Sequence, residues 1–259
     1  MISETPTPLT FPRSLRRAAW MLVLIALTAL ILLTSGAQPA RSAATADVAA
    51  EQPLVTLLSV KSVHREPIFG SASVVGLADQ RPITLVRTSL PIIGHTTDAE
   101  GRGWVRVRMP GRVFHRKTPP RTGWITAYDT KLSTTPYRLV LTLATRSLHV
   151  YRAGRRVKTF KVVVGKPSTP TPRGEFFIEE TMRLSRKHVG YPFALATSAR
   201  SSVLKEFMGG PGQIAFHGMV NIPGSKMGTA ASNGCIRMTT AGLMWLGSRI
   251  KAGVPLTIQ

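Results

Sequence analysis

The chain has 259 residues, of which 43% are hydrophobic and 18% are charged, and its formal net charge is +22. This length and apolar content suffice for one or two domains with a real core, and the charge favours a polyanionic neighbour. Nucleic acid is excluded as that neighbour, because the basic residues are spread over the whole chain, no nucleic-acid-binding motif appears and the N-terminus indicates export.

Residues 1–37 have the features of an export signal. Arg13, Arg16 and Arg17 precede an apolar run at 18–34, and small residues follow it. The run is long for a signal core and short for a membrane span of about 20 residues, so a cleaved signal peptide and a retained signal anchor both stay open. In either case the positive-inside rule places the rest of the chain outside the cytoplasm, with membrane contact only through this N-terminal segment.

Residues 38–53 are rich in Ala, Thr, Ser and Pro and are expected to form a linker or a pro-segment. Residues 54–130 carry short β-like runs separated by Gly, Pro and Asp, and they resemble a small bacterial SH3-type barrel. The strands expected there are 54–60, 73–76, 83–86, 104–109 and 123–127. The last two flank a basic loop. Two readings stay open for the arginines of this region, contact with anionic wall polymers and a solvated basic face.

A polar stretch at 129–136 is expected to hold no element and to separate the two domains. Beyond it, at 136–259, strands again dominate. The expected strands are 138–142, 147–152, 157–164, 176–178, 191–195 and 254–258. A short helix is expected at 198–207 and another after Thr239 or Thr240. The predicted fold class is therefore mainly β, with one or two short helices, and not a parallel α/β protein.

The single cysteine of the chain, Cys235, lies 18 positions after His217, with a loop rich in small residues between them. An exported protein with one cysteine cannot form an internal disulfide, so the thiol is either incidental or needed as a thiol. An imidazole and a thiol on adjacent strands suffice for nucleophilic catalysis. The alternative is a buried, inert cysteine with an unrelated histidine.

The sequence around these two residues resembles the active-site signature of the L,D-transpeptidases, the YkuD-type catalytic domain. His217-Gly218 and Ser232-Asn233-Gly234-Cys235-Ile236-Arg237 match that signature, except that Asn233 stands where a second histidine is commoner. The upstream segments 164–166 (VGK) and 170–176 (PTPRGEF) also match the family pattern. The resemblance covers about 136–259 and implies a β-sandwich fold.

The resemblance implies acyl transfer on peptidoglycan stem peptides, with Cys235 as the nucleophile and His217 as the base and later the acid. A backbone carbonyl is the expected partner that orients His217, and the amides of Gly234 and Cys235 are the expected oxyanion donors. Arg237 either holds a stem carboxylate or braces the loop. Gly218, Ser232 and Asn233 are expected to shape the loop. No cofactor and no metal site are expected, since no paired Cys or His spacing appears.

Three other functions compete with transpeptidation. An L,D-carboxypeptidase would use the same residues with water as the acceptor. A wall-binding protein without activity would need neither the thiol of Cys235 nor the imidazole of His217. A papain-like enzyme is disfavoured because its cysteine precedes its histidine. His188, in a basic loop that can cover a cleft, is more simply interpreted as a surface histidine.

Overall fold

The computed structural model describes residues 48–111, 120–207, 210–219 and 226–259, and these described residues belong to one compact unit. The expected export segment at 1–37 and most of the expected linker lie outside the described residues. Among the helices of the described part, none is long and apolar enough to cross a membrane.

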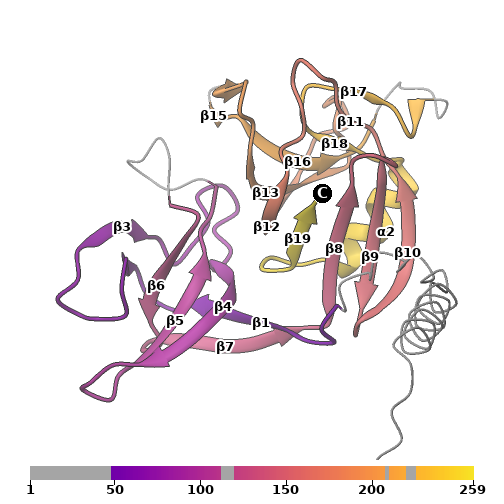
Figure 1. Ribbon diagram of the computed structural model, residues 1–259. Helices are drawn as coiled ribbons and strands as arrows, with labels where there is room; N and C mark the ends of the chain where they lie inside the picture. The colour runs from indigo at the N-terminus through magenta and orange to yellow at the C-terminus, as the bar shows by residue number, and fades with distance from the viewer. Residues whose placement is uncertain (1–47, 112–119, 208–209, 220–225) are drawn as a thin grey trace, which may run out of the picture. The chain divides into compact units, whose positions relative to one another are not determined.

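Residues 52–135 form a seven-stranded antiparallel sheet (Figure 1) with the strand order β3-β2-β6-β5-β4-β1-β7. Its strands are β1 (Gln52–Leu57), β2 (Lys61–His64), β3 (Ser73–Leu77), β4 (Ser89–Thr97), β5 (Gly103–Arg108), β6 (Thr122–Thr126) and β7 (Thr130–Thr135). Val105 and Val107 alternate into a buried apolar cluster, as the pattern of β5 predicts. The SH3-type assignment of 54–130 stays a prediction.

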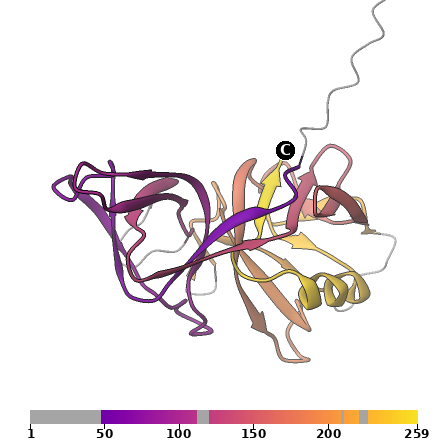
Figure 2. The same cartoon turned by 90° about the horizontal axis from the view of Figure 1, so that it is seen from below.

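Two expectations for this sheet are wrong. Residues 83–86 form a turn, with Leu85 at φ 57° and its N–H donating to the Arg81 carbonyl at 3.0 Å, so they cannot extend as a strand. The polar segment that was expected to hold no element contains β7, which pairs along its whole length with β1. Its side chains are largely exposed, so backbone pairing rather than apolar burial holds this strand. Figure 2 shows β1 and β7 side by side.

Residues 137–258 form an eight-stranded mixed sheet with the order β10-β9-β8-β19-β12-β13-β16-β18. The strands are β8 (Tyr137–Thr142), β9 (Ser147–Arg152), β10 (Arg155–Lys161), β12 (Gly174–Arg183), β13 (Phe193–Arg200), β16 (Gln213–His217), β18 (Ile236–Arg237) and β19 (Pro255–Ile258). Two smaller pairs join β11 (Val164–Gly165) to β17 (Ala230–Ser232) and β14 (Glu206–Phe207) to β15 (Gly210–Pro211).

The sheet curls around one core. Eight flat strands at about 4.8 Å spacing would separate the outermost strands by about 34 Å. Residues from β9 near one end (Leu148, Val150) and from β16 and β18 at the other (Phe216, Ile236) nevertheless belong to the same buried cluster. The single helix among the described residues, α2 (Thr240–Arg249), contributes Leu243 and Leu246 to that core. The mainly-β fold class is confirmed.

The helix expected at 198–207 is wrong, whereas the helix after Thr239 is confirmed. β13 continues to Arg200, which pairs with Gln213, and a turn follows in which the Ser201 hydroxyl accepts from the N–H of Leu204 at 2.9 Å. Leu204 and Phe207, whose spacing favoured a helix, lie in different elements: Leu204 is in this turn and Phe207 is in β14. At α2 the Thr239 hydroxyl accepts from the Gly242 N–H at 3.1 Å, as an N-cap should.

Strand β12 belongs to the second sheet by its hydrogen bonds but shares the core of the first. Phe177 is 1% exposed and packs into the cluster that contains Val55, Val105 and Ile125. The pairing of β12 with β13 shifts register between Ile178 and Glu180. The consecutive residues Glu179 and Glu180 are both buried at this point. A bulge of this kind lets consecutive side chains point to the same side.

We expect Phe177→Ala to destabilise the protein by about 3–5 kcal/mol, because it removes a fully buried ring and leaves a cavity in the first core. Urea unfolding followed by circular dichroism measures the change. Val157→Ala on β10, where the side chain is 46% exposed, is the matched control and should change stability by no more than about 0.5 kcal/mol. An equal effect of the two substitutions would show that β12 does not join the two cores.

Candidate active site

Two short parallel strands bring the predicted nucleophile and base together. β16 ends at His217, and β18 begins one residue after Cys235. Phe216 pairs with Ile236 and His217 with Arg237, so Cys235 lies one register step before the Phe216–Ile236 pair. The residues are 18 positions apart in sequence, and the pairing rather than the loop between them sets their proximity.

The imidazole of His217 is oriented by the backbone. Its Nδ1 lies 2.8 Å from the Gly218 carbonyl oxygen, which can only accept, so Nδ1 carries the proton and Nε2 keeps a lone pair. The expected carbonyl partner is therefore present. Burial lowers the pKa of His217 below 6.5, and the charge of Arg237 lowers it further, while the bond to Gly218 opposes the shift. His217 is thus neutral, as a general base must be.

Gly218 is confined by backbone on its other side. Its N–H donates to the Gly190 carbonyl at 3.0 Å, and a Cβ at this position would lie 1.9 Å from the Tyr191 carbonyl oxygen. Only glycine fits so close to another backbone segment. The glycine after the histidine is therefore required by the same geometry that orients the imidazole.

Cys235 rests as a thiol. Burial raises its pKa above the ordinary value of 9.0, although a backbone hydrogen bond from Ala215 and the charge of Arg237 favour the thiolate. The sulfur lies 4.0 Å from the Gln213 carbonyl oxygen, to which the S–H points as a weak donor. A neutral thiol beside a neutral imidazole implies that the proton moves during attack, and not that a thiolate–imidazolium pair exists beforehand.

The loop before Cys235 is held by the two upstream segments that match the family pattern. The Thr171 hydroxyl donates to the Gly234 carbonyl at 2.7 Å and accepts from the Gly165 N–H at 2.9 Å. Ser232 is fully buried, and its hydroxyl donates to the Cys235 carbonyl at 2.6 Å. Gly234 has φ +115°, a conformation that side chains rarely adopt.

One expected oxyanion donor is occupied. The Gly234 N–H donates to the Ser232 hydroxyl at 3.1 Å, so it is engaged inside the loop and does not face the cavity as an open donor. The Cys235 N–H has no acceptor among the residues that the structure describes. Of the two amides, Cys235 therefore remains the available one.

Cys235 and His217 both line a cavity of about 510 Å³, a size that suits a peptide-like substrate. Asn233 and Arg237 line it as well, together with His188 from the loop after β12. The Nε of Arg237 is buried and has no hydrogen-bond partner among the described residues. No three His, Cys, Asp or Glu side chains gather as a metal site within the described ranges.

Residues 136–258 match the YkuD family, whose description is "L,D-transpeptidase catalytic domain". A protein of Bacillus licheniformis provisionally named L,D-transpeptidase YkuD is 37% identical over 125 residues, which cover 48% of this chain and 67% of that protein. Its counterpart of the same name in Bacillus subtilis is 34% identical over 126 residues, 49% of this chain and 68% of that protein. The chain belongs to the YkuD family of L,D-transpeptidases.

A solved L,D-transpeptidase from Mycobacterium smegmatis aligns with 61% of this chain and 90% of its own length, at 18% identity and a TM-score of 0.37. The family match leaves 54–130 outside and contains every residue of the site. Cys235 and His217 thus lie inside the L,D-transpeptidase domain.

Four of the predicted site residues of this L,D-transpeptidase domain line one cavity: His217, Asn233, Cys235 and Arg237. The other three, Gly218, Ser232 and Gly234, shape the backbone behind it. His188, interpreted as a surface histidine, lines the cavity and is close enough to His217 to affect its charge; its Nδ1 accepts from the Gly190 N–H at 3.0 Å. Asn233, in the position of the commoner second histidine, is exposed at the cavity edge.

Sequence reasoning missed the roles of Thr171 and Gln213. Thr171 lies in the PTPRGEF segment that matches the family pattern, and this match indicates a segment typical of the family but not the role of the threonine. Nothing in the sequence singles out Gln213.

The raised pKa of Cys235 predicts a late titration. The rate of alkylation by iodoacetamide should increase with pH through a midpoint above 9.0, because burial keeps the thiol protonated until then. Mass spectrometry of the peptide containing Cys235 gives the rate, and glutathione measured in parallel is the reference for a solvated thiol. A midpoint below that of glutathione would show a preformed thiolate and contradict the neutral pair.

Proposed function

We propose that this chain is an exported peptidoglycan L,D-transpeptidase that forms 3→3 cross-links through a thioester on Cys235. The observation that carries the proposal is the pairing of β16 with β18, which places a thiol and a correctly protonated imidazole on the wall of one cavity.

In the proposed reaction, Nε2 of His217 takes the thiol proton while the sulfur attacks the carbonyl that joins the third stem residue to D-alanine. The Cys235 N–H stabilises the oxyanion, and the imidazolium then protonates the leaving amine, so that D-alanine departs and a thioester remains. The amine of a neighbouring stem next attacks the thioester and gives its proton to His217. The thiol is regenerated when the imidazolium returns that proton to sulfur.

Arg237 is suited to hold a stem carboxylate at the cavity. Its guanidinium has a buried donor without a partner among the described residues, which a carboxylate oxygen would satisfy. The charge of Arg237 also lowers the pKa of the Cys235 thiol, against the effect of burial. Arg237 can therefore stabilise the nucleophile and bind the substrate at the same time.

Product analysis distinguishes the proposal from the two alternatives. The full chain, incubated with tetrapeptide stems, should yield cross-linked dimers and free D-alanine by mass spectrometry. Tripeptides without dimers would indicate an L,D-carboxypeptidase, in which water replaces the amine, and unchanged stems would indicate a wall-binding protein.

Cys235→Ala should abolish both products while the protein stays folded, because the change removes little volume. His217→Ala should slow them by about 10²–10⁴-fold, the usual cost of losing a general base. A carbapenem should add its mass to the wild-type peptide that contains Cys235 and not to Cys235→Ala. Cross-linking by Cys235→Ala, or no adduct on folded wild-type protein, would end this assignment.

The basic surface suggests a second binding partner, the anionic polymers of the cell wall. Residues 136–259 contain 18 lysines and arginines against four acidic residues. On the edge strand β10 the cations Arg155, Arg156, Lys158 and Lys161 are all exposed, and no carboxylate of a described residue pairs with them.

Binding to purified wall polymer should therefore weaken as salt rises past about 0.15 M, where charges are screened beyond about 8 Å. Cosedimentation at several salt concentrations measures it, and Arg156→Gln with Lys158→Gln should weaken it at low salt. Thr159→Ala on the same strand is the uncharged control. Binding that ignores salt would show that the charge is incidental.

A further inference from the structure

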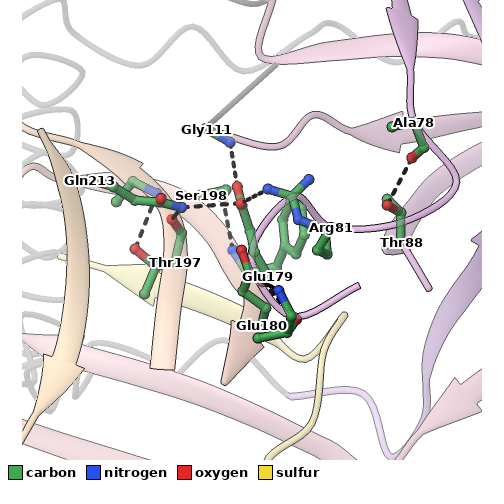
Figure 3. A network of polar contacts seen from close by, with 12 residues as sticks. Ala78, Arg81, Thr88, Gly111, Glu179, Glu180, Thr197, Ser198 and Gln213 are labelled. Carbon is green, nitrogen blue, oxygen red and sulfur yellow. Dashed lines mark hydrogen bonds and ion pairs between the residues drawn. The ribbon is translucent and has the colours of Figure 1, made fainter. Parts of the chain in front are cut away.

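A buried carboxylate lies where the two sheets meet, and the reaction described above does not use it. Glu179 on β12 has a side chain that is fully buried, and all its partners among the described residues are hydrogen-bond donors. Arg81 and the Gly111 N–H reach it from the region of the first sheet, and the Gln213 amide reaches it at 3.1 Å from the second (Figure 3).

These partners define the charge state of Glu179. Burial raises the pKa of its carboxyl above 4.5, while the charge of Arg81, the Gly111 N–H and the Gln213 amide lower it. No described partner accepts a hydrogen bond from the group, so its surroundings fit a carboxylate and not a protonated carboxyl. The guanidinium of Arg81, itself only 5% exposed, supplies the compensating charge.

Gln213 connects this carboxylate to the nucleophile. Its side-chain amide donates to Glu179 and also to the Thr197 carbonyl, at 2.7 Å, so the residue is fixed from two sides (Figure 3). Its own backbone carbonyl is the oxygen toward which the Cys235 thiol points. Gln213 is also the first residue of β16, the strand that ends at His217.

We propose that Glu179 is a positioning residue for Cys235, acting through Gln213, and that Arg81 of the first sheet region is needed to keep the carboxylate in place. This inference rests on the proposed role of Cys235 as the nucleophile. The first sheet region then contributes to the active site, because removing Arg81 would leave the buried Glu179 carboxylate, which binds the first residue of β16, without its compensating charge.

The same interface contains a natural control. Glu180, the next residue, accepts from the Thr84 N–H at 3.1 Å and from the Thr84 hydroxyl at 2.7 Å. This contact also joins β12 to the first sheet region through a buried carboxylate, although Thr84 itself is only half-buried. It does not involve Gln213 or any residue of the cavity wall. Thr84→Val therefore weakens the interface without touching the Arg81–Glu179–Gln213 bridge.

The experiment compares Gln213→Leu, the charge-neutral pair Arg81→Met with Glu179→Gln, and Thr84→Val in the full chain. The first two should slow acylation of Cys235 by a carbapenem by about 10- to 100-fold, since a misplacement of the order of 1 Å has costs of this size. Thr84→Val should stay within about twofold of wild type, the range of an ordinary substitution. A variant that combines Gln213→Leu, Arg81→Met and Glu179→Gln should react no more slowly than the slower of Gln213→Leu and the charge-neutral pair. The reason is that all these changes interrupt the same chain of contacts to Cys235.

Iodoacetamide alkylation is the second readout and does not depend on transpeptidase chemistry. Gln213→Leu should shift its pH midpoint downward, because the Gln213 backbone carbonyl that favours the protonated thiol loses the side-chain hydrogen bonds that hold it in place, whereas Thr84→Val should not. If the carbapenem acylates no variant and not the wild type, the proposed function fails, and the alkylation midpoints alone decide the positioning role.

The positioning role is overturned if Thr84→Val slows acylation as much as the other variants do. It is also overturned if all of them stay within about twofold of wild type, or if the alkylation midpoint of Gln213→Leu equals that of wild type. Should the charge-neutral pair fail to fold by circular dichroism, Gln213→Leu decides, because it leaves the Arg81–Glu179 ion pair intact.

Discussion

The pairing of β16 with β18 is the constraint on which the site depends. It consists of two residue pairs, and its neighbours make it rigid. Phe216 and Ile236 are fully buried, and Val163 exchanges two backbone hydrogen bonds with Arg237, at 2.9 and 3.0 Å, on the side away from β16. β18 is thereby held between two partners, so the residue before it, Cys235, has a fixed position relative to His217.

Burial and the charge of Arg237 shift the pKa values of both titrating groups of the site, Cys235 and His217. Burial disfavours charge on both, so the resting pair is neutral. Arg237 favours the thiolate but opposes the imidazolium, because a nearby cation stabilises one and repels the other. When the proton moves from Cys235 to His217, the stabilisation of the thiolate by Arg237 offsets part of the repulsion between Arg237 and the imidazolium. A carboxylate of a bound substrate would neutralise the charge of Arg237.

The sequence predicted the mainly-β class, the family, and the meeting of Cys235 with His217, because these follow from residue type and local order. It failed where tertiary contacts decide. The polar β7 is a strand only because β1 pairs with it, and the Gly234 amide is engaged only because Ser232 folds back onto it. Gln213 carries no local signal, since its importance comes from Glu179, which lies 34 positions away.

Acidic residues are few in the basic half of the chain, and most of them face the first sheet region. Of the four in residues 136–259, Glu179 and Glu180 bind Arg81 and Thr84, and Glu175 lies 3.7 Å from Arg108. A buried carboxylate separated from its partner is costly, so these contacts resist separation of the two sheets. The same distribution leaves the exposed cations of β10 without acidic neighbours among the described residues. The position of these few carboxylates therefore has three consequences. It joins the two sheets, it positions Gln213 and it leaves the surface of β10 positively charged.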